Sequence, residues 1–423
     1  MRQRFWNAKA AVAMATCATV LMLAGGCGTD GTSTTDTAGG TDTTVEDTAE
    51  DTPVVPECQQ VMPTPFSTPI KVPGEDGQMI TAKVKGTFLQ PANCQVGATC
   101  PLAIIVSDLR SGLADDPQAY PNYVEPASKM AGCLGINVVV FNLPGLGQGS
   151  YKSEGPANDV GGIYAEAAVK EMVLIQSSRE SVDKKQVGFI TIGAGLIPVT
   201  RAITVYNTGA LKLTAFLLDV EGPLDRCSIS EASENSQLSI GPSDGPGVSP
   251  TACNFNAAPQ SAQYPPAQNG KSASIVCAEG AWPITLTGQK CSDNSWWMVR
   301  EPSTYLKKVF QRYQRLQFKY DHRLPSHWAS RIAIEKVASS EAKFFALNNM
   351  PECQAAVDEE TCAALEAQGQ HCWLEGDYGN GMAPAPYAGA DYDEVTPEEL
   401  FTMVLPGYLT RLLDPAKFPN CKG

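Results

Sequence analysis

Three short segments of this chain carry residue types that could take part in acyl-transfer chemistry. A strand-like apolar run, Val187–Ile192, leads into the small residues Gly193–Gly195, and the charged segment Asp321–Pro325 follows another strand-like run. A tight turn between a strand and a helix is a place where a catalytic serine can be held. Such chemistry also needs a histidine base and a carboxylate to orient it, and the chain has 3 histidines.

The order and spacing of these segments resemble the α/β-hydrolase superfamily. Asn142–Ser150, a glycine-rich loop directly after a strand, is similar to the loop after that family's fourth strand. Asp321–Pro325 is similar to the D-x-x-x-P segment that bears the triad acid, and Val187–Gly195 stands where the nucleophile elbow belongs. The resemblance covers most of residues 68–348. It implies an α/β fold with a mostly parallel central sheet flanked by helices.

The elbow of that family reads G-x-S-x-G, with small residues on both sides of the nucleophile. Here Thr191 and Gly195 supply the small flanks, which places Gly193 at the nucleophile position. Glycine has no side chain with which to attack. Taking Thr191 as the nucleophile instead puts the bulky Phe189 where a small residue is needed.

The remaining parts of a triad depart from the family pattern as well. The oxyanion loop often begins His-Gly in the family, whereas this chain has Ser107 and Asp108, with Arg110 as a compensating charge. The candidate base, His371, lies in a cysteine-rich segment and reaches the site only if that segment folds back. His322 lies beside the acid in sequence, a position that points it away from the place of a base.

Two interpretations remain open for the carboxylates. Asp321 is either the triad acid or a structural acid that bonds loop backbone or Arg323. Together with Asp219, Glu221 and Asp225 it could hold calcium, since the carboxyl ends of parallel strands meet at one edge. The alternative is a set of salt bridges to arginines, for which the candidates are Arg226, Arg300 and Arg323.

Gly193–Gly195 is also similar to a dinucleotide-binding turn, with Asp219 closing the next strand. The third glycine of that motif is replaced by Pro198, so we expect neither a nucleotide nor another cofactor. We also expect no His-rich metal site. A further open question concerns tryptophans that either line a pocket beneath a cap or pack in the core, namely Trp282, Trp296, Trp297 and Trp328.

The rest of the sequence predicts alternating strands and helices, which is typical of an α/β layer fold. A hairpin is expected over Ile70–Gln90, with its turn at residues 74–77. Further strands are expected at Leu102–Val106, Asn137–Phe141, Val187–Ile192, Leu213–Val220, Leu316–Tyr320 and Ala342–Leu347. Helices are expected at Tyr123–Ala131, Ile163–Ser177, Pro302–Tyr313, Ser326–Ala338 and Pro397–Leu413, the last with Thr396 as its N-cap.

The 14 cysteines indicate an oxidising compartment. Apart from Cys17 and Cys27 near the N-terminus, they form an even set that fits a disulfide framework, with Cys94–Cys100 as a local pair. Zinc is the other interpretation, although no C-x-x-C pair occurs. Several cysteines lie in an expected disulfide-rich insertion, residues 222–295, and in a Cys-rich C-terminal segment, residues 350–423.

The N-terminus has the features of an export signal. A positively charged start precedes the apolar run Ala10–Leu23, which is too short to span a bilayer. The run ends in Leu23–Cys27, which resembles a bacterial lipobox and implies lipidation of Cys27 after removal of residues 1–26. An ordinary signal peptide cut near Gly26 is the alternative. Residues 27–57, rich in Thr, Gly and Asp, are expected to be a flexible tether.

The acidic balance of the chain excludes some partners. The net charge is −14, which disfavours binding to a nucleic-acid backbone. Removal of residues 1–26 leaves 28 basic and 45 acidic side chains, a net charge of −17. Because anionic lipids repel such a protein, attachment to a membrane has to come from acyl chains.

These patterns predict an exported, lipid-anchored protein of the cell envelope, in the outer membrane or at the cell surface. Residues 58–423 are expected to form an α/β-hydrolase-like domain that lacks serine-hydrolase activity. It would act as a binding or scaffold protein, with a small molecule or a peptide as ligand. The alternative is an active esterase or peptidase with a non-standard nucleophile, and a third possibility is a purely structural surface lipoprotein.

Overall fold

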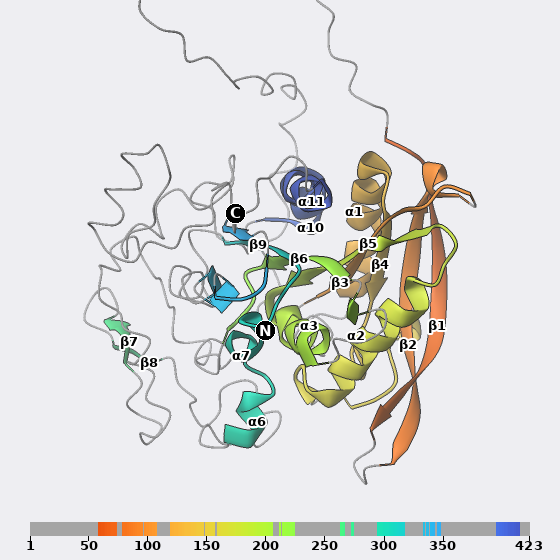
Figure 1. Ribbon diagram of the computed structural model, residues 1–423. Coiled ribbons are helices and arrows are strands. Elements are labelled where there is room, and N and C mark those ends of the chain that lie inside the picture. The colour runs from red at the N-terminus through yellow and green to blue at the C-terminus, as the bar shows by residue number, and fades with distance from the viewer. Residues whose placement is uncertain are drawn as a thin grey trace, which may run out of the picture. The chain divides into compact units, whose positions relative to one another are not determined.

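Short apolar runs form the centre of the fold. In the computed structural model, β3 (Cys100–Val106), β4 (Asn137–Phe141) and β5 (Val182–Ile192) lie side by side and parallel (Figure 1). All of β4 is buried, as expected for a parallel strand that is covered on both faces. The sheet has eight strands in the order β1-β2-β4-β3-β5-β6-β9-β10. The other members are β1 (Val61–Pro73), β2 (Met79–Pro91), β6 (Thr214–Val220), β9 (Arg312–Leu316) and β10 (Phe345–Leu347).

Only β2 runs against its neighbours in this described sheet. It pairs antiparallel with β1 on one side and with β4 on the other, while the remaining pairs are parallel. The predicted hairpin is therefore confirmed, and it is longer than expected because it begins at Val61 and ends at Pro91. The mostly parallel sheet flanked by helices confirms the predicted fold class, an α/β-hydrolase-like arrangement.

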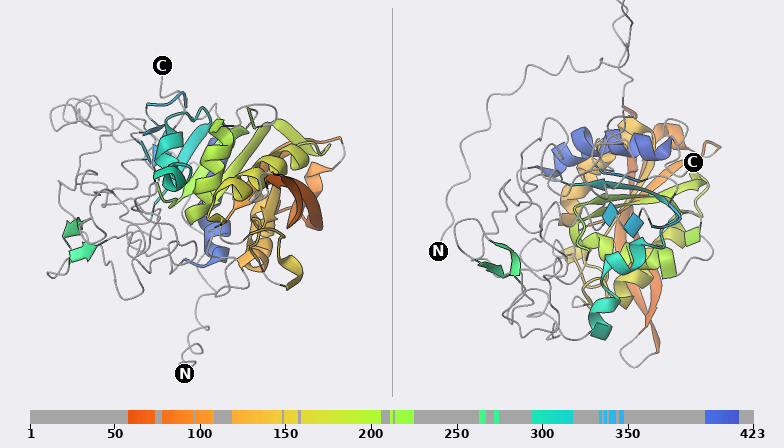
Figure 2. Two further views of the ribbon diagram at one scale, coloured as in Figure 1. Left: turned by 90° about the horizontal axis from the view of Figure 1, so that it is seen from below. Right: turned by 60° about the vertical axis from the view of Figure 1, so that its left-hand side comes forward.

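Helices cover both faces of the sheet and make a three-layered unit (Figure 2, right). One face carries α1 (Ala119–Leu134) and the C-terminal α11 (Leu405–Leu413). The opposite face carries α2 (Ile163–Gln176), α3 (Leu196–Val205) and α7 (Pro302–Leu306). Each helix layer encloses its own cluster of buried apolar side chains, so the sheet separates two hydrophobic cores.

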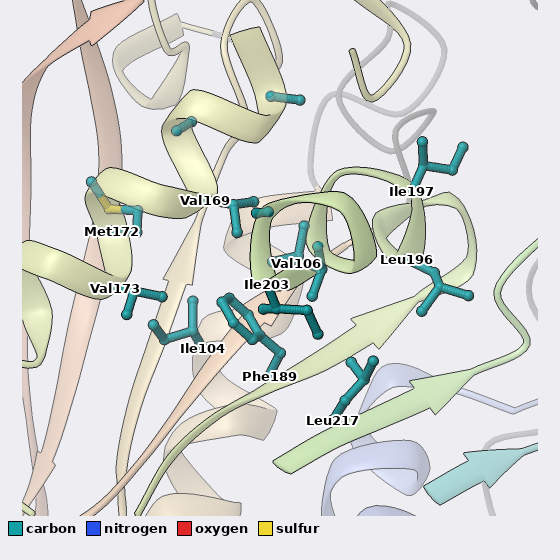
Figure 3. Close-up of a cluster of buried hydrophobic side chains, with 14 of the residues drawn as sticks. Ile104, Val106, Val169, Met172, Val173, Phe189, Leu196, Ile197, Ile203 and Leu217 are labelled. Atoms are coloured by element: carbon teal, nitrogen blue, oxygen red, sulfur yellow. The ribbon is translucent and has the colours of Figure 1, made fainter. Parts of the chain in front are cut away.

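The core beneath α2 and α3 holds the turn after β5 in place. Side chains from three strands meet side chains from the two helices (Figure 3). The labelled members are Ile104, Val106, Phe189 and Leu217 from strands and Val169, Met172, Val173, Leu196, Ile197 and Ile203 from helices. Burial of one such side chain contributes roughly 1.5–3 kcal/mol, so this cluster fixes the start of α3 against the sheet.

The register of the parallel strands brings four strand ends to one edge of the sheet. Val106 pairs with Thr191, Ile192 with Val220, and Val220 with Leu316. The residues that follow β3, β5, β6 and β9 therefore emerge next to one another, at the edge where open α/β sheets bind ligands. We call this the carboxyl edge of the sheet.

The C-terminal helical segment begins as the sequence predicts. Thr396 and Glu399 form a reciprocal capping box, in which the Thr396 hydroxyl accepts from the Glu399 N–H and the Glu399 carboxylate accepts from the Thr396 N–H. The segment then continues through α10 (Pro397–Glu399), a π-helical stretch at Leu400–Val404, and α11. The predicted helix Pro397–Leu413 and its N-cap are confirmed.

The segment around β9 differs from the sequence-based expectation. We expected a helix over Pro302–Tyr313 and a strand over Leu316–Tyr320. Instead, α7 ends at Leu306 and β9 already begins at Arg312. Polar side chains of β9 are buried and hydrogen-bonded inside the protein, which hides the strand from a search for apolar runs.

Two disulfides are described, and both lie near the amino-terminal ends of parallel strands. Cys94–Cys100 closes the short connection into β3, which confirms that expected pair. Cys58–Cys133 joins a residue three positions before β1 to the last turn of α1. The cysteines of the expected insertion and of residues 350–423 lie outside the described residues. Within residues 222–295, the structure describes a short antiparallel pair, β7 (Gln263–Pro266) and β8 (Ser272–Ser274), and α6 (Asn294–Met298).

The structure describes residues 58–73, 78–95, 97–107, 119–147, 149–156, 159–205, 211–212, 214–224, 263–266, 272–274, 294–317, 333–334, 336–337, 339–342, 345–347 and 395–414. All of them belong to one unit, Val55–Gly423. No helix within these ranges has both the length and the hydropathy required to cross a bilayer. The signal, Cys27 and the tether lie outside the described residues.

Candidate functional site

The turn after β5 is the central feature of the carboxyl edge. The backbone is extended at Ile192 (φ −118°), turns left-handed at Gly193 (φ +53°), and becomes helical at Leu196 (φ −61°). Left-handed backbone is strained for residues with a Cβ and readily adopted by glycine. A sharp strand-to-helix turn of this kind is the backbone setting of a nucleophile elbow, and Gly193 brings no reactive atom to it.

A second glycine allows this turn to lie against the end of β3. A Cβ at Gly195 would come within 2.1 Å of the Val106 carbonyl oxygen and 2.9 Å of the Ser107 carbonyl oxygen. No side chain fits in that gap, so glycine is required for the close approach. Ser107 is half-buried and directly follows β3, which places it beside the turn. Asp108, the other residue of the oxyanion-loop position, lies outside the described residues.

Thr191 lies inside the sheet rather than at its edge. The residue is fully buried in β5, and its hydroxyl donates a hydrogen bond to the Leu218 carbonyl oxygen at 3.4 Å. A nucleophile has to reach the substrate and a base. The buried, bonded hydroxyl of Thr191 is poorly placed for either contact. The candidate acid Asp321 and the candidate base His371 lie outside the described residues.

A buried polar network occupies the carboxyl ends of β6 and β9. Asp219 accepts hydrogen bonds through Oδ2 from the Tyr313 hydroxyl and from Arg315 Nη1, both at 2.6 Å. Its Oδ1 accepts from the Gly222 N–H at 2.8 Å. Arg315 is fully buried, and its Nη2 also donates to Gln317 Oε1 at 2.6 Å. The carboxylate thus neutralises a cation that would otherwise be very costly to bury.

This network settles how Asp219 is used. Its salt-bridge partner is Arg315, which was not among the three arginines that we considered from the sequence. Within the described residues no group of three or more His, Cys, Asp or Glu side chains is suited to hold a metal ion. Asp225 and Asp321, the other expected calcium ligands, lie outside the described residues.

Electrostatics and strain also mark this end of the sheet. Burial, reinforced by the charge of Asp219, raises the pKa of the Tyr313 hydroxyl well above its usual value. Glu221, directly after β6, has the same left-handed φ (+53°) as Gly193, although it carries a side chain. Its carboxylate accepts a hydrogen bond from Gln317 Nε2 at 3.1 Å, and its N–H donates to the Leu316 carbonyl oxygen.

A second polar cluster joins the segment before α7 to the start of α2. Asp159 accepts hydrogen bonds from the N–H groups of Tyr164 and Ala165 at 2.8 and 2.9 Å, and Arg300 lies 3.5 Å from its other oxygen. Burial raises the pKa of Asp159 despite these partners. The Arg300 guanidinium stacks on the ring of Trp296, 4.0 Å from its centroid.

The position of the neighbouring Trp297 shows whether this tryptophan lines a pocket or packs in the core. It is fully buried and belongs to the core beneath α2 and α3, and its ring meets that of Trp296 edge-on. Core packing is therefore its role. The other two tryptophans that we considered, Trp282 and Trp328, lie outside the described residues.

Sequence reasoning missed three members of the edge network, Tyr313, Arg315 and Gln317. The available signal in the sequence was Arg315, an arginine between strand-forming residues that lies shortly before the segment Asp321–Pro325. A charged side chain within a buried strand requires a buried partner. Asp219, already singled out, was the acid at the end of a neighbouring strand.

Comparison with known proteins returns structural matches alone. No protein-family model matches the chain, and no curated protein matches it. An esterase of Pyrococcus furiosus aligns with 12% identity and a TM-score of 0.42, over 82% of this chain and 92% of the esterase. Carboxyl esterase 2 of the fungus Tuber melanosporum aligns with 12% identity and a TM-score of 0.44, over 88% and 90% of the two chains.

An acylaminoacyl peptidase of Pyrococcus horikoshii aligns with 13% identity and a TM-score of 0.44. This match covers 83% of the present chain and 42% of the peptidase, so the chain spans less than half of that protein's length. The structural neighbours are thus esterases and acylaminoacyl peptidases at low identity. The assignment of the fold rests on the strand order and pairing described above.

Proposed function

We propose that this protein is an exported lipoprotein whose α/β-hydrolase-like domain binds a ligand at the cell envelope and lacks serine-hydrolase activity. The observation that carries this proposal is Gly193, the left-handed residue at the turn between β5 and α3. A serine hydrolase forms its covalent intermediate through a side-chain oxygen at this turn. With glycine there, the turn has no atom that can form the acyl bond.

The packing around the turn supports a binding role. Gly195 lies against the end of β3, and the buried side chains beneath α3 hold the start of that helix. These contacts fix the shape of the carboxyl edge, and none of them requires a nucleophile. Ligands of open α/β sheets bind at this edge. Ser107 and the backbone at Gly193 are the described groups beside which a small molecule or a peptide would lie.

The export and anchoring parts of the proposal rest on the N-terminal sequence. The run Ala10–Leu23 and the lipobox-like segment that ends at Cys27 motivate them. The disulfides Cys58–Cys133 and Cys94–Cys100 support an oxidising compartment, because such bonds rarely persist in a reducing cytosol.

The absence of hydrolase activity is tested by labelling the full chain with a fluorophosphonate probe. We expect no labelling of the wild type above a heat-denatured sample, with an active serine hydrolase in the same mixture as positive control. A Thr191→Val variant should behave like the wild type. Covalent labelling of a residue in the folded wild type would overturn the proposal. It would favour the alternative, a hydrolase with a non-standard nucleophile.

The binding role needs its own measurement. We expect a screen of small molecules and short peptides to reveal compounds that raise the melting temperature of the wild type. This stabilisation should be lost in Ser107→Trp, which places a large side chain beside the turn, and kept in Ser178→Trp on an exposed segment. A ligand that stabilises both variants equally would not bind at the carboxyl edge, and a screen without any ligand would favour a purely structural role.

A further inference from the structure

The outermost strand of the sheet, β1, has an unusual distribution of prolines. It is 13 residues long and pairs with β2 without any shift of register (Figure 1). In the described sheet it stands at the end of the strand order, so no described strand pairs with its other side. Four of its residues are prolines, namely Pro63, Pro65, Pro69 and Pro73. The free side of such a strand is ordinarily a template for another strand.

Hydrogen bonds of β2 establish which backbone groups of β1 face its free side. The Lys83 N–H donates to Glu154 Oε2 at 2.9 Å, and the Lys83 carbonyl accepts from the Glu154 N–H at 2.8 Å. The Lys85 N–H donates to Ser153 Oγ at 3.0 Å, and the Lys85 carbonyl accepts from the Asn142 N–H at 3.0 Å. Lys83 and Lys85 therefore use their backbone groups on the side away from β1.

Residues opposite one another in an antiparallel pair either exchange both hydrogen bonds or exchange none. Because Lys83 and Lys85 bond elsewhere, their partners Pro69 and Ser67 belong to pairs that exchange none. The backbone groups of Pro69 and Ser67 thus point to the free side. Since the register is continuous, the same holds for every second residue of β1, from Val61 to Pro73.

All four prolines fall on these outward positions. Proline has no N–H, so its position here costs the pairing with β2 nothing and removes a donor from the free side. The N–H groups that remain on the free side belong to Val61, Ser67 and Lys71, and no two of them are consecutive outward positions. A strand that adds to a sheet edge needs a continuous ladder of donors and acceptors.

We propose that the free edge of β1 is closed to strand addition by this proline pattern, so that neither a second copy of the chain nor an extended peptide can extend the sheet there. The side chains of Pro63, Pro65 and Pro69 are also exposed. Their place on the outside of the fold is thus not explained by packing in the core. β1 and β10 stand at the two ends of the strand order, and this proposal concerns β1 alone. It does not depend on the proposed function.

The proposal is tested by restoring backbone N–H donors on the free side of β1 in the full chain. The triple variant Pro63→Thr, Pro65→Thr, Pro69→Thr regains three outward N–H groups with residues that favour strands. We expect light scattering after size exclusion to show a larger, concentration-dependent mass than for the wild type. A matched control, Thr64→Val with Thr68→Val, raises strand propensity at inward positions, which are those whose backbone groups face β2. This control should keep the wild-type mass. A well-folded triple variant with the wild-type mass would overturn the proposal.

A pair of adjacent substitutions tests the geometry independently of assembly. Ser67→Pro removes an outward N–H, and we expect a melting temperature close to that of the wild type. Thr68→Pro removes an inward N–H that faces β2, and we expect a loss of several degrees. Equal losses for the two variants would show that the assignment of outward positions is wrong. This comparison remains decisive if the triple variant does not fold.

Discussion

At the scale of single residues, Gly193 combines a backbone requirement with a chemical consequence. Its φ of +53° lies in the left-handed region, where a residue with a Cβ is destabilised by about 1–2 kcal/mol. We therefore expect Gly193→Ala to lower the free energy of unfolding by about this amount. Urea denaturation followed by circular dichroism measures the change.

The matched control for that substitution is Gly407→Ala. Gly407 lies within α11, and a Cβ there would meet nothing within 4 Å. Alanine is the better helix former, so the control should be neutral or more stable by up to about 1 kcal/mol. If both variants changed stability in the same direction, strain at Gly193 would not be the cause.

The Tyr313 hydroxyl makes stability depend on pH in the alkaline range. In the unfolded chain a tyrosine loses its proton near pH 10. In the folded chain burial and the charge of Asp219 raise the pKa, so Tyr313 keeps its proton there. Above about pH 10 the unfolded state then binds fewer protons than the folded state, and the free energy of unfolding falls as pH rises. Below that pH this contribution is fully present.

The measurement is the free energy of unfolding at several values between pH 8 and about 11, a range set by the tyrosine pKa. We expect Tyr313→Phe to reduce the slope above about pH 10 and to be less stable at pH 8, because Asp219 loses a hydrogen bond. Some slope should remain, since burial also raises the pKa of Tyr408. The control Tyr151→Phe changes an exposed side chain and should keep the wild-type slope. An unchanged slope in Tyr313→Phe would contradict this account.

At the scale of elements, the sequence was most informative where hydrophobic pattern and burial coincide. The strand Asn137–Phe141 is apolar apart from its first residue and was predicted with its observed bounds. The strand ending at Ile192 was predicted too short, because the exposed polar residues 184–185 interrupt the apolar pattern while the backbone remains extended. The strand Arg312–Leu316 was misplaced, because its buried Tyr313 and Arg315 bond to Asp219, which lies far away in the sequence.

The residues of the candidate site likewise fall into two groups, those that the local sequence predicts and those that depend on distant contacts. The order of strand, small residues and helix is local, and it was sufficient to single out Gly193 and Gly195. The ion pair of Asp219 with Arg315 joins residues 96 positions apart. Nothing in either segment specifies this pairing, which depends on the register of β6 against β9. Asp219 was therefore identified by its place at a strand end, and its partner was not.

The two described disulfides allow a prediction at the element scale. Cys58–Cys133 closes a loop of 75 residues, whereas Cys94–Cys100 closes a loop of 6. The loss of loop entropy in the unfolded chain corresponds to about 4 kcal/mol for the longer loop and about 2 kcal/mol for the shorter one. Replacing both cysteines of a pair by serine should therefore destabilise the protein more for Cys58–Cys133. Urea unfolding of the two double variants makes the comparison, and the reverse ranking would contradict it.

At the scale of the whole molecule, both described disulfides lie at the edge of the sheet opposite to Gly193. Cys133 lies in the last turn of α1, just before β4 begins, and Cys100 is the first residue of β3. The carboxyl edge, in contrast, is held by the buried pair of Asp219 and Arg315. Covalent restraint and polar restraint thus act at opposite ends of the parallel strands. The edge proposed to bind a ligand therefore carries neither described disulfide.

The overall charge leads to a prediction about membrane attachment. The mature chain that we propose, without residues 1–26, would have a net charge of −17 and be repelled by anionic lipids, so the proposed attachment through acyl chains at Cys27 should not depend on salt. We expect the protein made in a bacterial host to enter the detergent phase of a Triton X-114 partition at both low and high salt. Cys27→Ser should move it to the aqueous phase, whereas Cys17→Ser, within the signal, should not. Salt-sensitive attachment, or detergent partition of Cys27→Ser, would mean that the charged surface or another segment holds the membrane.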